Sequence, residues 1–535
     1  MGRNGKTSPW MVSPIGRCWK SPGQLKTNPE HYRVRLEKKK GLCYNSRQAA
    51  IGEKALLGSV SSAAVRRQAF SDLCKFLCCQ QFQQYFLPAL GSPKSGPKGL
   101  QPILIGDGQM NNTLRRRRIG EEVYFSSVTD PKFKHNRISV NYILPLEKET
   151  VSANALIPFL LRKGSRECPD FTLLNQKLYS LYGATLSADV SKYGGYQVLD
   201  VSISGLDDKF TLDGEAMVAQ CAGLLAGLAT DPNLVDGAFP EKDVELEKQY
   251  LIDSIEAEIN DKRAYAINKC RTIMCEGEPA ALRKYGYVED VKKITPQSAA
   301  ETFLRVRRTA RVEILFVGCG DCTPAEEIME ATFAKLDRAP IALPEQVRVP
   351  AAAQVKQEVE RMDLSQSKLA MGFRTGAAQN MDELSAMRLM VAMFGGTPFS
   401  RLFVNVREKL SLCYYCAARF DRITGIMLVD SGVEAQNREK AQAEILNQLE
   451  VMKRGGFTDE ELENTLLTMK NSLYTVSDSL SGLEDWYMAQ LMQSTARSPQ
   501  EEAELMAKVT REDVMAAAQK VTLDTVYFLT GEKED

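Results

Sequence analysis

Histidine is nearly absent from this sequence. Its 535 residues contain two, His31 and His135, far apart along the chain. No pair of imidazoles can therefore be built locally, which argues against an ordinary histidine-ligated zinc centre. The sequence also lacks an apolar run of about 18 or more residues, which excludes a membrane-spanning helix.

A disulfide framework is missing as well. The 13 cysteines are an odd number at irregular spacings, and no signal-peptide pattern precedes them. Reduced thiols and a cytoplasmic location are therefore expected. Two C-x-x-C pairs occur, Cys319 with Cys322 and Cys413 with Cys416, too far apart for a zinc ribbon. The second pair lies in a predicted strand, where alternation would direct its sulfurs to opposite faces. Both pairs are interpreted as chance.

The chain has no net charge, because 68 Lys+Arg balance 68 Asp+Glu, but the charges are unevenly distributed along it. Residues 1–109 hold 17 basic and 5 acidic side chains, and the remainder holds 51 and 63. We predict that residues 1–118 are a basic segment that is either disordered or a mis-annotated extension of the protein. They are rich in Pro, Gly, Ser and Lys and show no sustained period. A basic arm for nucleic acid or an anionic surface is the alternative. The arginine run at 115–118 is interpreted as a solvated lead-in.

From about residue 119 onward, periodic apolar residues predict a regular succession of elements. The predicted strands are 137–144, 184–190, 198–204, 312–317, 368–373, 413–420, 425–431 and 525–529. The predicted helices are part of 155–162, then 171–182, 212–228, 241–262, 296–305, 381–394, 401–410, 441–452, 459–474 and 511–521.

The same order of elements occurs twice, and three short matches support a duplication. They pair Phe239 with Phe457, Ile294-Thr295 with Val509-Thr510, and Phe316 with Leu529, separated by 213 to 218 positions. We therefore predict an α+β protein of two homologous mixed repeats, residues 119–338 and 354–535. A linker at 339–353, marked by three prolines, joins them.

Residues 395–415, GGTPFSRLFVNVREKLSLCYY, carry the most specific motif. A turn of small residues precedes Ser-Arg-Leu-Phe at 400–403, and an Arg-Glu-Lys-Leu helix end at 407–410 leads to a tyrosine-bearing strand. This pattern resembles the pitrilysin/insulinase peptidase family, which includes the mitochondrial processing peptidases and respiratory core proteins. The resemblance covers residues 119–535 and implies that the two repeats enclose a chamber.

In that family the active repeat carries His-x-x-Glu-His on its first helix, where two imidazoles hold zinc and the glutamate acts as general base. Aligned on the Lys-Gly-Ser at 163–165, the motif falls on residues 155–159. Ala155 and Phe159 then replace the histidines, and Pro158 replaces the glutamate. Pro158 is expected to mark the start of the helix. The distal ligand position falls at Glu245, interpreted as a solvated helix-face charge, so no metal is expected in this chain.

The resemblance assigns substrate binding to Arg407 and Tyr414. A guanidinium and a phenol can both donate hydrogen bonds to a peptide carbonyl that gains charge during hydrolysis. Spacing alone leaves a structural interpretation open. Arg407 would then cap its helix and form a surface ion pair, while Tyr414 would pack between the repeats.

Two functions follow from the resemblance. In the first, the chain is a catalytically inactive subunit of a heterodimeric zinc peptidase, of a kind that bacteria often encode beside an intact paralogue. That paralogous partner holds the zinc on an intact motif, and this chain supplies Arg407 and Tyr414 to bind a peptide or unfolded protein segment. In the second, the chain is a non-enzymatic scaffold or peptide-holding protein. Neither function involves nucleic acid or a membrane.

Overall fold

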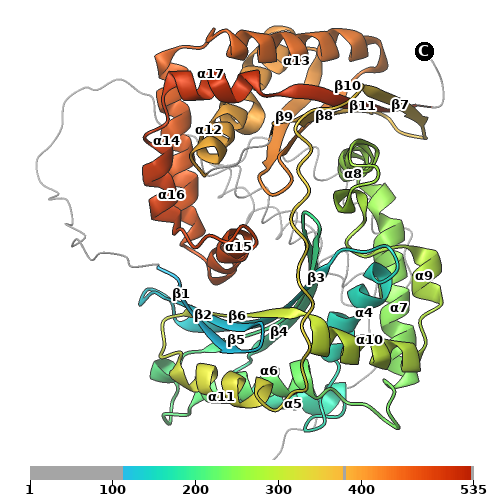
Figure 1. Cartoon of the computed structure of the whole chain (residues 1–535), viewed down its shortest axis with the longest axis vertical. Helices are drawn as coiled ribbons and strands as arrows, with labels where there is room; N and C mark the ends of the chain where they lie inside the picture. Colours follow the sequence, from blue (N-terminus) through green and yellow to red (C-terminus); the bar gives the residue numbers. More distant parts are fainter. Residues whose placement is uncertain (1–112, 377–380, 532–535) are drawn as a thin grey trace, which may run out of the picture. The chain divides into compact units, whose positions relative to one another are not determined.

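The structure is a computed structural model that describes residues 113–376 and 381–531. Predictions for residues 1–112 lie outside the described residues. All described residues belong to one compact unit, Asp107–Asp535. They form two mixed α/β repeats, each built on one twisted sheet (Figure 1), so the predicted fold class is confirmed.

The first repeat contains a six-stranded sheet. Its strands are β1 (Arg115–Gly120), β2 (Val123–Thr129), β3 (His135–Pro145), β4 (Thr185–Tyr193), β5 (Tyr196–Leu206) and β6 (Arg311–Gly318). Its helices are α4 (Val151–Leu161), α5 (Phe171–Ser180), α6 (Met217–Thr230), α7 (Glu241–Glu256), α8 (Lys262–Met274), α9 (Val288–Lys292), α10 (Pro296–Thr309) and α11 (Thr323–Phe333).

The second repeat contains a five-stranded sheet. Its strands are β7 (Lys356–Arg361), β8 (Ser367–Arg374), β9 (Cys413–Asp421), β10 (Ile426–Val433) and β11 (Thr522–Thr530). Its helices are α12 (Met381–Val391), η4 (Ala392–Gly396), η5 (Leu402–Lys409), α13 (Arg438–Lys453), α14 (Asp459–Val476), α15 (Leu480–Leu491), α16 (Pro499–Met506) and α17 (Arg511–Gln519).

Strand order shows that the repeats are duplicates. The first sheet runs β1-β2-β6-β3-β5-β4 and the second β7-β11-β8-β10-β9, so the orders agree apart from the extra strand β1. Strand β2 is parallel to β6, and the equivalent β7 is parallel to β11. The next pairs, β6 with β3 and β11 with β8, are antiparallel. The sequence matches fall at equivalent places. Thr295 and Thr510, for example, are the N-caps of α10 and α17, and each forms a capping box.

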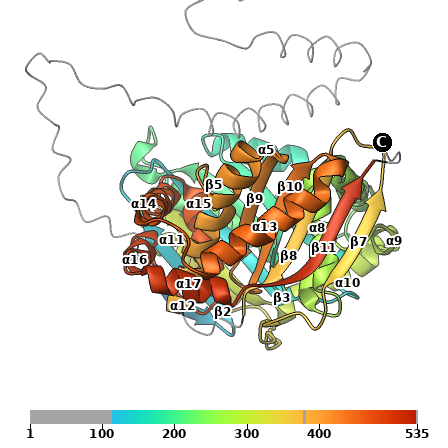
Figure 2. The ribbon, with the colours of Figure 1, turned by 90° about the horizontal axis from the view of Figure 1, so that it is seen from above.

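One face of each sheet packs on helices of its own repeat. In the first repeat α4, α6 and α10 cover β3 and β5 with a core that includes Val140, Leu156 and Leu225. In the second repeat α12, α13 and α17 supply the corresponding layer (Figure 2). Burial of these apolar side chains is the main favourable term for each repeat.

The other face of each sheet contacts a helix that belongs to the other repeat. Helix α8 packs on β8, β10 and β11, where Cys270 and Met274 join a buried cluster with Leu428 and Tyr527 (Figure 1). Helix α15 packs on β3 and β6 of the first repeat. The two repeats therefore exchange one helix each, and neither sheet is covered by its own repeat alone.

Ion pairs of opposite polarity hold the exchanged helices. Arg263 of α8 donates from Nε to Oδ2 of the buried Asp430 on β10 at 2.5 Å. Glu484 of α15 accepts from Arg137 on β3. Helix α8 thus presents a cation to the second sheet, whereas α15 presents an anion to the first.

Asp200 lies on β5 beside the Arg137–Glu484 pair, and few neighbouring groups stabilise the negative charge of its carboxylate. Its side chain is 16% exposed, and its Oδ2 accepts from Ser202 at 3.1 Å and lies 4.0 Å from Arg137 Nη2. Its Oδ1 is buried and has no hydrogen-bond partner among the described residues. Burial, and then the charge of Glu484, raise the pKa of Asp200 to about 8.

Asp200 should make the free energy of unfolding fall as pH rises. Between the ordinary aspartate pKa of about 3.9 and about 8, the native state retains a proton that the unfolded chain has released. We expect Asp200→Asn to exceed the wild type in stability at pH 8 by about 1 kcal/mol or more, with the difference vanishing towards pH 4. Urea unfolding at several pH values measures it, and Asp253→Asn, at an exposed site on α7, is the control. Equal pH slopes for all three proteins would contradict the assignment.

The arginine run at 115–118 is exposed to solvent, as predicted, but it is a strand of the first sheet and not a lead-in to the fold. These residues lie in β1, which pairs antiparallel with β2. Arg116 Nη2 lies 2.6 Å from the fully buried carboxylate of Glu313, and Arg117 Nη2 lies 2.5 Å from Glu330. The run is basic because β1 lies beside acidic groups of β6 and α11, which sequence periodicity does not reveal.

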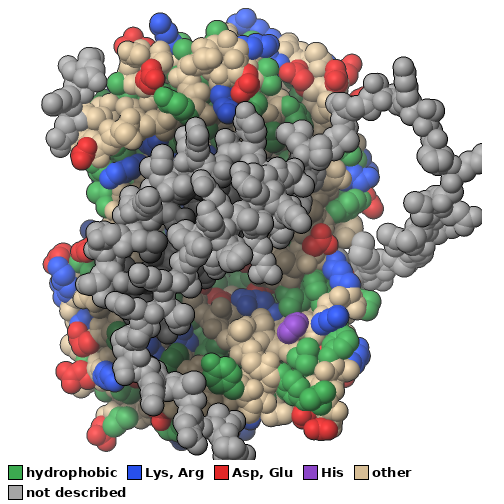
Figure 3. All heavy atoms as spheres, turned by 180° about the vertical axis from the view of Figure 1, so that it is seen from behind, with side chains coloured by type: hydrophobic (Ala, Val, Ile, Leu, Met, Phe, Trp, Pro, Cys, Tyr) green, Lys and Arg blue, Asp and Glu red, His purple; other side chains and the backbone are tan. Residues whose placement is uncertain are grey.

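Charged side chains of both signs are interspersed over the visible part of the face drawn in Figure 3. Within residues 113–376 and 381–531, no helix is both long and apolar enough to cross a bilayer.

Candidate functional site

Residues 395–415 form the end of η4, the helix η5 and the start of β9. Helix η5 has π-type hydrogen bonding, which is rare and occurs frequently at functional sites. Ser411 follows it with φ of 50°, and β9 begins two residues later. The predicted helix and strand are confirmed. The predicted glycine turn is wrong, because Gly395 and Gly396 belong to η4.

Gly395 is required by a close approach of η4 to β9. A Cβ at this position would lie 2.6 Å from the backbone nitrogen of Ala418 and 2.9 Å from Leu402 Cδ1. The contact with the backbone nitrogen cannot be relieved without moving β9 or η4. A Cβ at Gly396 would meet no atom closer than 3.5 Å.

Gly395→Ala is expected to lower the free energy of unfolding by about 1–3 kcal/mol, the usual cost of overpacking. Gly396→Ala adds the same methyl group to an exposed neighbouring position and should change stability by less than about 0.5 kcal/mol. Denaturant unfolding of both variants checks the difference. Equal effects would show that η4 can move away from β9 without cost.

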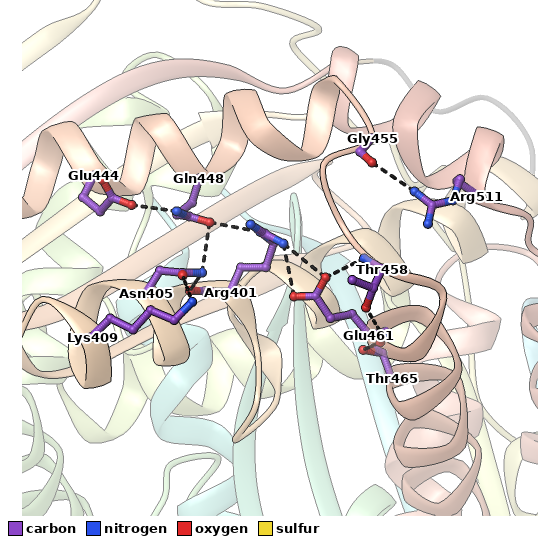
Figure 4. A network of polar contacts seen from close by, with 10 residues as sticks. All are labelled: Arg401, Asn405, Lys409, Glu444, Gln448, Gly455, Thr458, Glu461, Thr465 and Arg511. Carbon is purple, nitrogen blue, oxygen red and sulfur yellow. Dashed lines mark hydrogen bonds and ion pairs between the residues drawn. The ribbon is translucent and has the colours of Figure 1, made fainter.

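A polar network fixes η5 against α13 and α14 (Figure 4). Arg401, the arginine of the Ser-Arg-Leu-Phe motif, donates to Gln448 at 3.0 Å and to both oxygens of Glu461 at 3.1 and 3.2 Å. Asn405 donates to the same Gln448 oxygen at 3.1 Å. Arg401 therefore positions the helix that carries Arg407. The motif contained this residue, but its spacing gave no sign of these partners.

Arg407 and Tyr414 line one surface cavity of about 400 Å³, and Glu434 and Asn437 also belong to its lining. Arg407 comes from the last turn of η5 and Tyr414 from the start of β9. Tyr414 is 60% exposed, and its hydroxyl donates to Glu434 Oε1 at 3.4 Å. It therefore does not pack between the repeats, as the structural interpretation required.

The Arg407 guanidinium contacts two side chains of its own helix. Its Nη1 lies 3.3 Å from Glu408 Oε1, and its centre lies 4.6 Å from the ring centroid of Phe403. The pair with Glu408 is more than a third exposed on both sides, so its contribution to stability is small. Arg407 thus forms the surface ion pair of the structural interpretation and also lines the cavity.

A β-bulge at Tyr414 changes the geometry of the second C-x-x-C pair. Cys416 pairs with Ser431 and Cys413 with Val433, so the pairing skips one residue of β9. Because Ser431 and Val433 share a face of the sheet, Cys413 and Cys416 share it too. The prediction that the two sulfurs point to opposite faces is wrong, since it assumed unbroken alternation.

Helix α4 has no chemistry suited to a metal at the aligned motif positions. Ala155 is fully buried in the core, and Phe159 packs against Tyr285 with the rings tilted and their centroids 6.4 Å apart. Pro158 lies inside the helix, seven residues after Val151, so the prediction that it marks the helix start is wrong. The helix is buried almost all round, and packing offsets the roughly 3 kcal/mol cost of an interior proline.

Helix α7 carries two glutamates in different environments near the predicted distal ligand position. Glu245 is a 59% exposed side chain that pairs with Lys248 at 2.8 Å, in line with its predicted solvated state. Glu247 is buried and faces the end of α4, where Arg162 and Lys163 lie 3.3 and 2.6 Å from its oxygens. Glu247 was missed, although it shares a helical face with the apolar Val244 and Leu251.

The residues at the aligned motif do not fit a zinc ion. Ala155, Pro158 and Phe159 carry hydrocarbon side chains without a lone pair. Among the residues that the structure describes, no three His, Cys, Asp or Glu side chains are grouped so that they could hold a metal. No metal chemistry is therefore assigned to this chain.

Known proteins resemble the chain in sequence. A family model described as "Peptidase M16 inactive domain" matches residues 293–469. "Probable inactive metalloprotease YmfF" of Bacillus subtilis (strain 168) is 30% identical over 404 residues, 76% of this chain and 95% of that protein. "Uncharacterized zinc protease YmxG" of the same strain is 30% identical over 115 residues, 21% of this chain and 28% of that protein.

Solved structures share the fold. A conserved protein from Enterococcus faecalis V583 has a TM-score of 0.73 at 25% identity, covering 79% of this chain and 100% of that one. A protease from Helicobacter pylori has a TM-score of 0.66 at 16% identity, covering 78% and 99%. The extent of the match to the Bacillus protein, together with the unsuitable motif on α4, decides the assignment. The chain belongs to the M16 peptidase family, the pitrilysin/insulinase family, as one of its inactive members.

Proposed function

We propose that this chain is the non-catalytic subunit of a heterodimeric zinc peptidase and that Arg407 and Tyr414 bind the substrate peptide for it. The paralogous partner subunit would carry the intact His-x-x-Glu-His motif and the zinc. The observation that carries the proposal is the shared cavity of Arg407 and Tyr414, set against hydrocarbon side chains at the three positions of the zinc motif.

The donors in the cavity suit a peptide carbonyl. Arg407 offers a planar set of N–H groups and Tyr414 an exposed hydroxyl, and both can donate to an oxygen that becomes negative during hydrolysis. Glu408 and Glu434 accept from them in the absence of substrate, through a distance of 3.3 Å and a long bond of 3.4 Å. Such weak contacts can be exchanged for bonds to a substrate at small cost.

The relatives support a division of labour between two chains. Bacillus subtilis (strain 168) has one relative named as an inactive metalloprotease and another named as a zinc protease. A genome that contains both kinds can provide a zinc-holding chain as partner for one that lacks the zinc motif.

A non-enzymatic scaffold or peptide-holding protein is the second candidate. It is favoured by the contacts of Arg407 with Phe403 and Glu408, which a purely structural arginine would also make. The two candidates differ in whether a peptidase activity depends on this chain.

Co-purification with a paralogue from the same genome that has an intact motif tests the proposal. The chain alone should hydrolyse no unfolded peptide and should purify without zinc, whereas the complex should contain one zinc and hydrolyse the peptide faster than the paralogue alone. If the paralogue is fully active alone, or never associates with this chain, the subunit proposal fails and the scaffold function is favoured.

A further inference from the structure

Cys413 and Cys416 lie on one face of β9. The bulge at Tyr414 brings them to this face, as shown by the pairing of Cys416 with Ser431 and of Cys413 with Val433. Both side chains are buried, 9% and 5% exposed. A regular strand would have separated them across the sheet, so the bulge creates a dithiol that the sequence spacing alone does not.

The two thiols differ in accessibility and acidity. Cys413 lines the cavity of Arg407 and Tyr414, whereas Cys416 lies deeper. The hydrogen bond that Cys413 accepts from Cys416 lowers the pKa of Cys413 to about 7; burial opposes this, while Ser431 and the charge of Arg407 add to it. The pKa of Cys416 is raised, first by the same hydrogen bond and then by burial. Cys413 therefore suits the attacking thiolate, whereas Cys416 is the thiol that stays protonated until the second step.

We propose that Cys413 and Cys416 are a modification site that forms a reversible intramolecular disulfide by exchange with a small-molecule disulfide of the glutathione type. This inference does not rest on the proposed function, because it concerns only the chemistry of the two thiols.

The exchange takes two balanced steps. The Cys413 thiolate attacks one sulfur of the oxidant, whose S–S bond breaks, and the released thiolate takes up a proton. Cys416 then loses its proton and attacks the Cys413 sulfur of the mixed disulfide, expelling the second small thiol. The two cysteines are oxidised and one small disulfide is reduced to two thiols. Cys413 acts first because it is the sulfur that reaches the cavity.

The chain contains its own matched control. Cys319 and Cys322 have the same spacing, but Cys319 follows β6 and Cys322 is the N-cap of α11. Burial raises the pKa of Cys319. Trypsin should release each pair on one peptide, residues 410–419 for Cys413 and Cys416 and residues 312–335 for the control.

Mass spectrometry after equilibration of the full chain with glutathione buffers tests the proposal. In an oxidising buffer most of peptide 410–419 should lose two hydrogen atoms and resist alkylation, while peptide 312–335 remains fully alkylated. Dithiothreitol should reverse the change, and Cys416→Ser should instead retain a glutathione on Cys413. The proposal is overturned if peptide 410–419 stays alkylated, if wild-type Cys413 stops at the mixed disulfide, or if both pairs oxidise equally.

A trivalent arsenical, which bridges two adjacent thiols without oxidising them, tests the geometry separately. One equivalent of phenylarsine oxide should protect peptide 410–419 of the native chain from alkylation and leave peptide 312–335 unprotected. In urea, where the bulge is lost, this selectivity should disappear. Selectivity that persists in urea would trace the reaction to local sequence and would overturn the role given to the fold.

Discussion

Arg407→Ala is expected to lower kcat/KM of the reconstituted heterodimer for an unfolded peptide about 100-fold, the usual effect of removing one donor to a developing oxyanion. The loss should appear mainly in kcat, because the guanidinium bond strengthens as the carbonyl oxygen becomes negative. Tyr414→Phe removes only the hydroxyl and should lower kcat/KM about 10- to 100-fold. Steady-state kinetics of complexes with equal zinc content measures both effects.

Lys440→Ala is the control for these variants. Lys440 is exposed on α13, three residues beyond Asn437 of the cavity wall, and its replacement removes the same charge without changing the cavity lining. Its complex should retain wild-type kinetics. If Arg407→Ala and Tyr414→Phe also assemble and hydrolyse peptides at the wild-type rate, the pair has no part in substrate binding.

Arg374→Ala is expected to cost about 3–5 kcal/mol of unfolding free energy, because it leaves buried acidic groups without a partner. The Arg374 side chain is 3% exposed at the end of β8. Its Nε donates to Asp524 at 2.8 Å, and its Nη2 donates to Glu278 at 2.6 Å and to the Met274 carbonyl at 2.8 Å. Asp524 and Glu278 belong to different repeats, so one side chain joins the second sheet to the end of α8.

Arg166→Ala provides the comparison for this measurement. Arg166 also forms an ion pair, 3.0 Å from Asp231, but its side chain is 82% exposed. Its removal should cost less than about 1 kcal/mol, as for other surface pairs. Urea unfolding followed by circular dichroism distinguishes the two. Should Arg374→Ala prove too unstable to purify, Arg374→Lys, which keeps the charge and loses the fork, should show an intermediate loss.

Strands of the described chain were predictable where one face is buried against helices of the same repeat. The pattern at 137–144, for example, became β3, which adds two residues at the start and one at the end. β7 was missed because it is an edge strand of mostly polar residues, KQEVER, without apolar alternation. Its assignment depends on parallel pairing with β11, more than 160 positions later in the sequence.

Helices α8 and α15 were missed for a different reason. The predicted helix at 241–262 merged α7 with the chain leading to α8, whose sequence KRAYAINKCRTIM has little amphipathic character. The partner of α8 is a sheet of the other repeat, so its few apolar residues become meaningful only in the assembled fold. A local pattern cannot contain that information.

The candidate site was predicted in part. The positions of Arg407 and Tyr414 in a helix end and a strand start followed from the family motif, and the structure places both at one cavity. Their role in binding remains a prediction. The bulge that unites Cys413 with Cys416 was not predictable, because one skipped residue in strand pairing leaves no signal in the spacing.

The exchange of α8 and α15 determines the order in which parts of the protein can complete their folding during synthesis. Arg137 and Glu484 are separated by 347 positions, so the face of the first sheet that meets α15 stays open while most of the remaining chain is synthesised. Loop-closure entropy makes such distant contacts late events in folding. The first repeat therefore leaves the ribosome with an uncovered sheet face, which carries Arg137 and Asp200 and which only the last part of the chain can cover. Incompletely covered intermediates of this kind are the species from which large proteins aggregate.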